Sequence, residues 1–378
     1  MSALRQWIER RRPESKAAAH GPIGVHFTHE HLHLVQLETL GTGGIGLRCS
    51  QSLAYPGTRT ELMASPAAVS RLVRRAMRAG KFSGRNVVSA MPPEQVRVMS
   101  VSYPASSTGN ESGSILKLMA DRVDGALSDY VIDYVPIRMS SRDGDRLALV
   151  TVSRLEHVNN YLESLRSVGM DVSFLEIGPL AIKRLISVGP ATDQHNHVIV
   201  INIGDTTSHI TTISGQRLLA DQEVQFGEEL LLSAIEKPLG LTRSVVKELV
   251  LAHGLDPELK SDATADDNVD TEVVRTLAEI VKPEFLKLVR EISRAFLFAE
   301  SESQGDGRKR ICISGGIAQW PGVATLLSSL ARMPVESLGR EHMPFASDAA
   351  SIATLSDQQA AEMSTAVGLA LRGMLANE

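Results

Sequence analysis

The sequence predicts an α/β protein of two domains that binds a ligand at the ends of its β-strands. Two stretches carry this prediction. Residues 198–213 read VIVINIGDTTSHITTI, in which two apolar, β-branched runs flank a Gly-Asp-Thr-Thr turn, a pattern typical of a buried β-hairpin. Residues 310–323 read RICISGGIAQWPGV, a short apolar strand that ends in two glycines ahead of a helical pattern. In α/β sheets, ligands bind beyond the carboxyl ends of the strands.

The two turns suit different parts of a ligand, the first a phosphate group and the second a flat ring. Gly204 lets the backbone approach a ligand closely, and Thr206 and Thr207, beside Asp205, offer amides and hydroxyls to phosphate oxygens. The pair 315–316 (Gly-Gly) leaves room for a flat ring. Taken alone, the first stretch also fits a plain hairpin with a polar tip, because short glycine-rich motifs often match by chance.

Composition narrows the class of protein. The chain has 378 residues, enough for two domains with their own cores, and a net charge of −5 that disfavours nucleic acid as a partner. The two cysteines, Cys49 and Cys312, lie far apart in apolar surroundings, as expected of reduced thiols in a cytoplasmic protein. No apolar run is long enough to span a bilayer, so we expect another chain to bring this one to any membrane.

The first domain is expected over 21–190, after a flexible polar leader, 1–20. Within the leader, 3–12 fits either a frayed terminus or a short docking helix. Residues 23–37 predict strand, turn and strand, and 47–54 a third strand. His29, His31 and His33 alternate in this hairpin and would share one face, which fits an ordinary strand face or a zinc site.

The rest of this domain is predicted as follows. Residues 66–80 form an amphipathic helix whose arginines are a solvated face, and 86–90 form a strand. Residues 96–157 form a small inserted α+β unit with a helix over 114–127. A further helix runs from Ser153 to a glycine cap at Gly169.

The second domain is expected over 191–348, with a helical subdomain at 225–300. Residues 256–272 are acidic and lack hydrophobic periodicity, which predicts a mobile loop. Residues 273–298 predict a long helix with a break at Pro283, since proline removes a helical hydrogen bond. The C-terminal segment, 361–378, holds a helix (364–375) that should return to the first domain.

The order of these motifs resembles the second half of the actin-like ATPase superfamily, which includes actin, sugar kinases, heat-shock chaperones and the division protein FtsA. The implied fold is two actin-like (ribonuclease H-like) domains around a nucleotide cleft. More narrowly, a strand ending in Tyr103-Pro104, then DYVPI (133–137) and FLEIGPLAIKRL (174–185), is similar to the type IV pilus assembly protein PilM family. This resemblance runs from about Ile23 to the C-terminus.

The resemblance implies ATP as the cofactor and extends the candidate site. The first hairpin would be a second phosphate loop, with Gly24 and Thr28. Gly227 with Glu228 matches the family's Gly-Gly or Gly-Glu segment. The helix 243–251, with Lys247, takes the place that contacts ribose and adenine, although it also fits an ordinary amphipathic helix.

Three departures from the superfamily argue against efficient hydrolysis. His26, Gly178 and Asn202 stand where the superfamily tends to carry acids, and Asp205 is offset from the usual position. Histidine lacks the hard anionic oxygen that Mg²⁺ prefers. We therefore assign no catalytic residue and no metal site, and expect ATP binding with weak or absent hydrolysis and without well-held Mg²⁺.

The function implied by the resemblance is a cytoplasmic scaffold of the type IV pilus inner-membrane platform. The family binds the cytoplasmic N-terminal tail of a PilN-like membrane protein in a groove, which here would involve residues around 96–103 and 131–137. Contacts with other platform components are implied, as is a position peripheral to the inner membrane through partners. Two alternatives stay open: an active ATPase or kinase of the same fold, and an FtsA-like filament protein. The tail 361–378 lacks the amphipathic membrane helix that an FtsA-like protein needs.

Overall fold

A computed structural model describes residues 20–41, 43–104, 110–138, 145–189, 197–256, 267–302, 307–345 and 355–374. The expected leader, apart from His20, and most of the expected acidic loop lie outside the described residues. The chain divides into two compact units. Unit 1 comprises Met1–Pro190, Met343–Thr354 and Met363–Glu378, and unit 2 comprises Ala191–His342 and Leu355–Glu362. No helix in the described ranges is long and apolar enough to cross a membrane.

Unit 1 is built on a five-stranded mixed sheet in the order β3-β2-β1-β4-β8. Its strands are β1 (His20–Phe27), β2 (His31–Thr39), β3 (Ile45–Ala54), β4 (Asn86–Ala90) and β8 (Asp171–Glu176). β2 runs antiparallel to both of its neighbours, β1 and β3, whereas β1, β4 and β8 run parallel. The predicted hairpin at 23–37 and the strands at 47–54 and 86–90 are confirmed.

Helices cover both faces of this sheet. On one face α2 (Arg59–Met63), α3 (Pro66–Ala79) and α5 (Leu155–Ser167) enclose a core that includes Val25, Leu34, Val73 and Leu165. On the other face α6 (Gly178–Val188) and the second half of α11 (Asp357–Ala370) pack against β4 and β8 through Ala181 and Leu369. Alternating burial along β1, with Val25 on one face and Gly24 on the other, follows from the strand's two-residue period.

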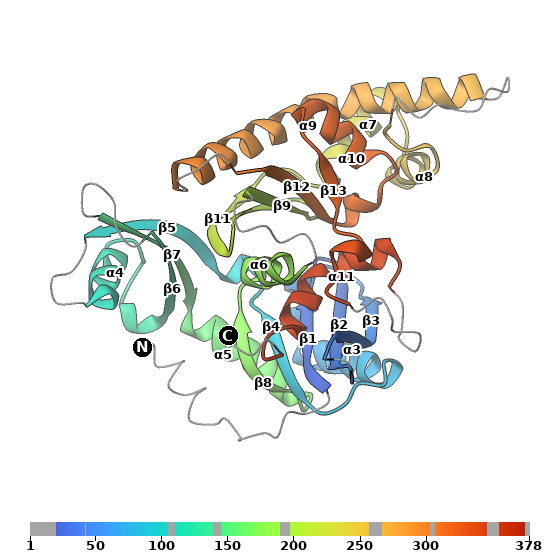
Figure 1. Cartoon of the computed structure of the whole chain (residues 1–378). Coiled ribbons are helices and arrows are strands. Elements are labelled where there is room, and N and C mark those ends of the chain that lie inside the picture. Colours follow the sequence, from blue (N-terminus) through green and yellow to red (C-terminus); the bar gives the residue numbers. More distant parts are fainter. Residues whose placement is uncertain are drawn as a thin grey trace. The chain divides into compact units, whose positions relative to one another are not determined.

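Unit 1 also carries a small sheet in the order β5-β7-β6 (Figure 1). Its strands are β5 (Arg97–Pro104), β6 (Tyr130–Arg138) and β7 (Asp145–Arg154), and the 3₁₀ turns η1 (Pro93–Gln95) and η2 (Leu127–Asp129) flank it. Helix α4 (Glu111–Ala120) packs on one face of this sheet over Val101, Val150 and Val152. The helix is shorter than the predicted 114–127, because Asn110 caps its start and Asp121 already lies beyond its end.

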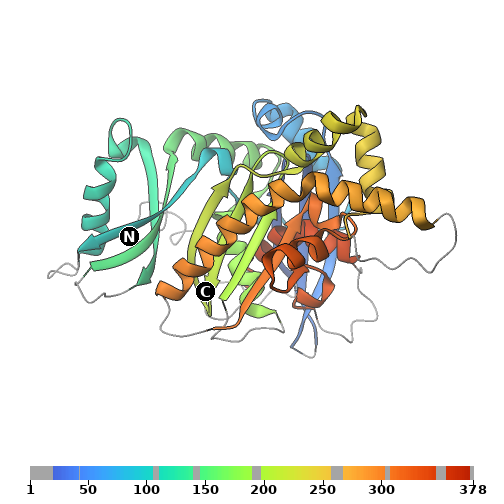
Figure 2. The same cartoon turned by 90° about the horizontal axis from the view of Figure 1, so that it is seen from above.

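Unit 2 holds the second five-stranded sheet, in the order β11-β10-β9-β12-β13. Its strands are β9 (His197–Ile203), β10 (Ser208–Ser214), β11 (Arg217–Val224), β12 (Lys309–Gly315) and β13 (Val335–Ser337). Its helices are α7 (Glu228–Leu239), α8 (Arg243–His253), α9 (Asp267–Glu302) and α10 (Val323–Ala331), with 3₁₀ turns η3 (Gly316–Gln319) and η4 (Arg340–His342). The long helix α9 crosses one face of the sheet (Figure 2), where Val281, Phe285 and Ile292 join the core.

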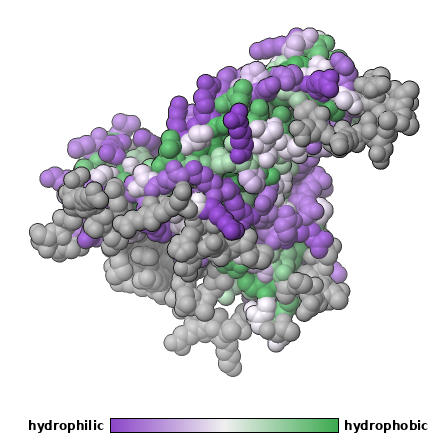
Figure 3. All heavy atoms as spheres, turned by 45° about the horizontal axis from the view of Figure 1, so that its top comes forward, coloured by the Kyte–Doolittle hydropathy of each residue, from purple (hydrophilic) through white to green (hydrophobic). Residues whose placement is uncertain are grey.

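The predicted break at Pro283 is wrong, because α9 is one continuous helix from Asp267 to Glu302. Pro283 is exposed, whereas Val281, Phe285 and Leu288 are buried on the sheet side. Packing of this apolar stripe outweighs the loss of one backbone hydrogen bond on the solvent side. Figure 3 shows hydrophilic side chains beside hydrophobic ones over the region of α9.

Candidate functional site

In unit 2, the tip of the β9–β10 hairpin packs tightly against the start of α7. A β-carbon on Gly204 would lie 2.4 Å from the Thr207 carbonyl oxygen, and one on Gly227 would lie 2.2 Å from the Asp205 oxygen. The backbone N–H groups of Glu228 and Glu229 donate to the carbonyl oxygens of Gly204 (3.1 Å) and Asp205 (2.9 Å). These two amides at the N-terminus of α7 are therefore used to hold the hairpin tip.

The carboxyl end of β12 adjoins the same tip, because β12 pairs in parallel with β9. Gly315 has a φ of +92°, and a β-carbon there would lie 2.2 Å from the Ile203 oxygen. Gly316 differs, because the nearest neighbour of a β-carbon added there would be a Glu228 carboxylate oxygen at 3.6 Å, an ordinary contact. Close packing against backbone oxygens requires glycine at positions 204, 227 and 315. At Gly316 no such contact requires glycine, and space for a side chain remains there.

Lys247 extends this cluster from α8. Its Nζ lies 2.7 Å from Oε1 of Glu228, and the lysine side chain remains 45% exposed. Val246 and Val250 are buried on the other side of α8. The helix is therefore amphipathic, as its pattern indicates, and also directs Lys247 to the segment that follows Gly227. Unit 2 thus gathers the predicted residues Gly204, Asp205, Gly227, Glu228, Lys247, Gly315 and Gly316, with Thr206 and Thr207 in the hairpin turn itself.

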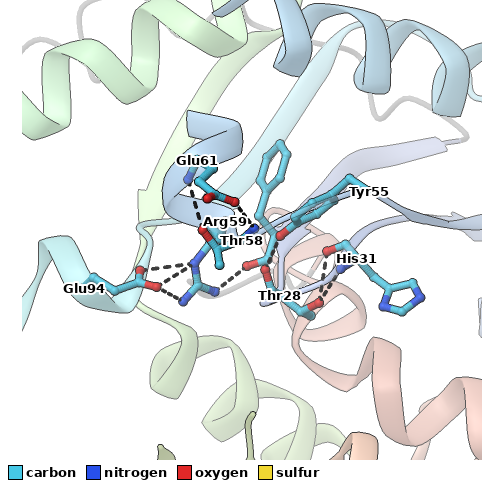
Figure 4. Close-up of polar contacts among 8 residues, drawn as sticks. Thr28, His31, Tyr55, Thr58, Arg59, Glu61 and Glu94 are labelled. Atoms are coloured by element: carbon cyan, nitrogen blue, oxygen red, sulfur yellow. Dashed lines mark hydrogen bonds and ion pairs between the residues drawn. The ribbon is translucent and has the colours of Figure 1, made fainter. Parts of the chain in front are cut away.

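The two predicted residues of unit 1, Gly24 and Thr28, have structural roles there. A β-carbon on Gly24 would lie 2.1 Å from the Ala366 oxygen, so glycine lets α11 pack closely on β1. The Thr28 hydroxyl donates to the His31 carbonyl (3.0 Å) and accepts from the His31 N–H (3.0 Å), which closes the hairpin turn (Figure 4). These contacts account for both residues, and their part in nucleotide binding stays a prediction.

Arg59, which the sequence reasoning missed, ties this turn to its surroundings. It donates to the Phe27 carbonyl (2.8 Å) and to both carboxylate oxygens of Glu94 (Figure 4). Burial raises the pKa of Glu94, but the hydrogen bond and charge of Arg59 outweigh it and hold that pKa below its ordinary value. The only local sequence signal was the capping box formed by Thr58 and Glu61 at the start of α2.

Two buried histidines of this hairpin, His26 and His33, are neutral. His26 lies opposite His33 in the β1–β2 register, and the rings of His31 and His33 stack with centroids 5.8 Å apart. Burial lowers the pKa of His26 and of His33 to about 3, with a smaller contribution from Arg59 at His26 and from the neighbouring histidines at His33. A neutral imidazole therefore stands at His26. Within the described ranges these histidines do not bring three metal-ligating atoms together, so the zinc alternative is not supported.

Metal-ligating side chains do gather in unit 2, at Cys312, Glu336 and His342. The site already holds a cation, since Arg310 donates to Glu336 at 2.8 Å and His342 lies 3.0 Å from the same carboxylate oxygen. Burial raises the pKa of the Cys312 thiol to about 12, so it stays protonated. This group is an ion-pair network at the β12–β13 edge.

The positions where an acid could polarise water offer no available carboxylate. Glu176, two residues before Gly178, is 7% exposed and accepts at both oxygens from Arg184 (3.0 Å each). Arg372 lies 3.3 Å from the same carboxylate. Asn202 has an amide whose oxygen accepts from the Ser314 hydroxyl at 3.5 Å. Glu176 therefore joins β8, α6 and the segment after α11, and is not placed to activate water.

Comparison with known proteins decides the family. A family model described as type IV pilus assembly protein PilM matches residues 24–374, nearly the whole chain. The chain belongs to the PilM family. The predicted match from Ile23 to the C-terminus is thus confirmed, and the protein is an actin-like member of the type IV pilus assembly machinery.

Solved structures confirm the fold of this PilM family member. A PilM–PilN type IV pilus biogenesis complex is similar over 94% of this chain and 99% of that chain, with a TM-score of 0.73 and 20% identity. The ethanolamine utilization protein EutJ from Carboxydothermus hydrogenoformans is similar over 98% of this chain and 95% of that chain, with a TM-score of 0.51 and 13% identity. The predicted α/β, actin-like fold class is confirmed.

Proposed function

We propose that this PilM family member is a cytoplasmic scaffold that binds the N-terminal cytoplasmic tail of a PilN-like inner-membrane protein. Membership of the family is the main support, together with the small sheet of unit 1. Its outer strands, β5 and β6, each pair on one side only among the described strands. Open strand edges accept an extended peptide through main-chain hydrogen bonds.

The small sheet also packs against the main body of unit 1. Val96 and Val131, at the roots of β5 and β6, pack against the main core of that unit. On β5, Val101 and Tyr103 face α4, while Ser100 and Ser102 are exposed on the other face. An extended tail along β5 would therefore meet a preformed edge with small side chains, and would pay little reorganisation cost on binding.

Peptide binding tests this proposal directly. A labelled peptide of the cytoplasmic tail of the PilN-like protein from the same organism is titrated with the full-length chain. We expect saturable binding with a Kd of about 1 μM, a usual range for such motifs. Ser100→Arg should weaken binding at least about tenfold, because a long charged side chain stands beside the proposed peptide path.

The matched control is Ser128→Arg, an exposed serine in η2 of the same small subdomain. It adds the same charge and should leave peptide binding unchanged. Absence of binding to the wild-type chain, or an equal loss in both variants, would remove the support for β5 as the peptide site. Nucleotide-dependent pelleting of the purified chain would instead favour the filament alternative.

The proposal includes ATP as a ligand of the unit 2 cluster, with weak or absent hydrolysis. The space at Gly316 and the exposed Lys247 support binding, whereas the neutral His26 and the engaged Glu176 argue against well-held Mg²⁺ and an activated water. A turnover above about 1 s⁻¹, the ordinary range of phosphoryl-transfer enzymes, would contradict weak hydrolysis.

The proposed location follows from the partner. A PilN-like tail would hold this chain at the inner membrane, where it could also contact other platform components. Separation of cells into soluble and membrane fractions, with and without the PilN-like protein, tests this. The chain should move to the soluble fraction when the partner is absent.

A further inference from the structure

Helix α3 presents a row of arginines that the proposed function does not use. Arg71, Arg74, Arg75 and Arg78 are all exposed. At the α-helical period they fall within an arc of about 100° around the axis. The opposite side of the helix is buried in the core of unit 1: Val69, Leu72, Val73 and Ala76. The four guanidinium groups are therefore held on one outward face, which we call the α3 arginine face.

No counter-charge compensates this face within the described part of the chain. None of the four arginines forms an ion pair with a described residue, and α3 contains no acidic residue. Lys81, just beyond the helix end, is exposed and adds a fifth positive charge. The concentration of positive charge contrasts with the net charge of −5 of the whole chain.

The long helix α9 shows how this protein treats an ordinary solvated face. Three of its five basic residues are matched by acids three positions earlier, at 2.7–2.9 Å: Glu279–Lys282, Glu284–Lys287 and Glu291–Arg294. On α3, in contrast, Arg71 and Arg75, and Arg74 and Arg78, are spaced i,i+4, which places like charges side by side and destabilises a helix. Helix stability alone does not account for the pattern on α3.

We propose that the α3 arginine face binds the surface of an anionic lipid bilayer. The proposal rests on the proposed function, which brings unit 1 to the inner membrane. Clusters of four or more basic residues bind anionic leaflets electrostatically, and guanidinium groups pair well with phosphate oxygens. Because the apolar side of α3 is already buried, the face would lie on the headgroups without inserting.

Two features favour a bilayer over nucleic acid. The face is the outside of a single helix with no aromatic side chain, so it offers no surface on which bases could stack. The surrounding chain is acidic, which opposes binding to a long polyanion that would extend past α3. A planar surface that contacts only α3 meets less of this repulsion, because interactions between charges more than about 8 Å apart are largely screened at physiological salt.

Vesicle sedimentation with the full-length protein tests the proposal. Vesicles of phosphatidylethanolamine and phosphatidylglycerol are compared with vesicles of phosphatidylcholine alone, at low and at physiological salt. We expect binding to the anionic vesicles only, weakened by salt. Replacing the four arginines by glutamine should lower the partition coefficient about fivefold for each arginine removed.

The control variant carries the same change in net charge on α9: Lys282, Lys287, Arg290 and Arg294, each replaced by glutamine. It should keep at least half of the wild-type binding, and a thermal melt of both variants shows that they fold. Failure of the wild-type chain to bind anionic vesicles at low salt would overturn the proposal, as would an equal loss in the α9 variant. Tighter binding of a single-stranded oligonucleotide than of the vesicles would also overturn it, in favour of nucleic acid.

The same variants separate this inference from the proposed function. In the peptide titration, the α3 variant should bind the PilN-like tail as the wild-type chain does, because α3 and β5 are different surfaces of unit 1. Vesicle binding can therefore be absent while peptide binding is present, which would overturn the lipid inference alone. Peptide binding can likewise be absent while vesicle binding is present, which would overturn the proposed function alone.

Discussion

At Gly204, Gly227 and Gly315 a β-carbon would lie 2.2–2.4 Å from a backbone oxygen, whereas at Gly316 the nearest atom would lie at 3.6 Å. Contacts below about 3 Å force the backbone to move, so changes at the first three positions would disturb the fold as well as any ligand. Loss of nucleotide binding in a Gly204 variant would therefore not identify a phosphate site. Gly316 is the informative position.

We expect Gly316→Val to weaken ATP binding at least about tenfold while lowering the free energy of unfolding by less than about 1 kcal/mol. The added side chain would occupy the space beside Glu228 that a nucleotide would need. Equilibrium binding of ATP, with and without Mg²⁺, measures the first effect, and urea unfolding measures the second. Gly315→Ala is the contrasting variant and should mainly lose stability. Wild-type ATP affinity in Gly316→Val would place the nucleotide elsewhere.

His33 carries a pH dependence that can be measured without any ligand. Its burial lowers its pKa to about 3, so below pH 6.5 the unfolded chain takes up a proton that the folded chain does not. Stability is therefore complete above about pH 6.5 and falls as the pH drops toward 3. At pH 5 this one imidazole should cost about 2 kcal/mol relative to pH 7.

The variant His33→Leu tests this reasoning. Urea unfolding of the wild-type chain and of the variant is compared at pH 7 and at pH 5. We expect the wild-type chain to lose about 2 kcal/mol more than the variant between these two values, because leucine does not titrate. An equal loss in both would mean that His33 is protonated in the folded chain, or that another group accounts for the acid sensitivity.

At the scale of elements, strands with continuous apolar runs and helices with clear periodicity could be predicted. The hairpin 23–37 and the helix 243–251 correspond to β1–β2 and α8. The predicted helix breaks and boundaries were wrong where tertiary packing determines the local structure. Pro283 does not break α9, since the buried stripe around Phe285 holds the helix on the sheet. The C-terminal helix begins at Asp357, seven residues before the predicted start at Ser364.

The two edge strands of the unit 2 sheet were harder to predict than its central strands. β11 (Arg217–Val224) reads as mixed polar and apolar, and β13 (Val335–Ser337) is three residues long. Both owe their conformation to pairing with a neighbouring strand, β10 and β12 respectively. Neither carries an apolar run long enough to stand out in the sequence.

The candidate site was predictable where it is local. The hairpin tip and the Gly-Gly strand meet because β9 and β12 are neighbours, so adjacency in one sheet joins Gly204 and Gly315. Ion pairs between distant segments were not predictable, since Arg184 with Glu176 and Arg59 with Glu94 depend on how α6 and α2 pack. Gly24 matched a phosphate-loop pattern, although its contact with α11 accounts for the glycine.

At the scale of the whole molecule, the proposed lipid-binding face on α3 and the proposed peptide site on the small sheet belong to the same compact unit. Each interaction alone is modest. When one protein makes two weak contacts, the second becomes an intramolecular step. For two sites joined by a short flexible linker its effective concentration is on the order of 1 mM, and the combined affinity rises well above either affinity alone.

The combined effect can be measured on vesicles that display the PilN-like tail peptide. On anionic vesicles the wild-type chain should bind at least about a hundredfold tighter than on neutral vesicles with the same peptide density. Replacing the four α3 arginines by glutamine should lower the affinity for anionic vesicles to the affinity for neutral ones. Ser100→Arg should leave only the affinity that comes from the lipid. If the association constant on anionic vesicles that display the peptide only equalled the sum of the constants for the peptide and for the lipid alone, one molecule could not bind the peptide and the bilayer at once. The chain would then have to leave the lipid surface in order to bind its partner.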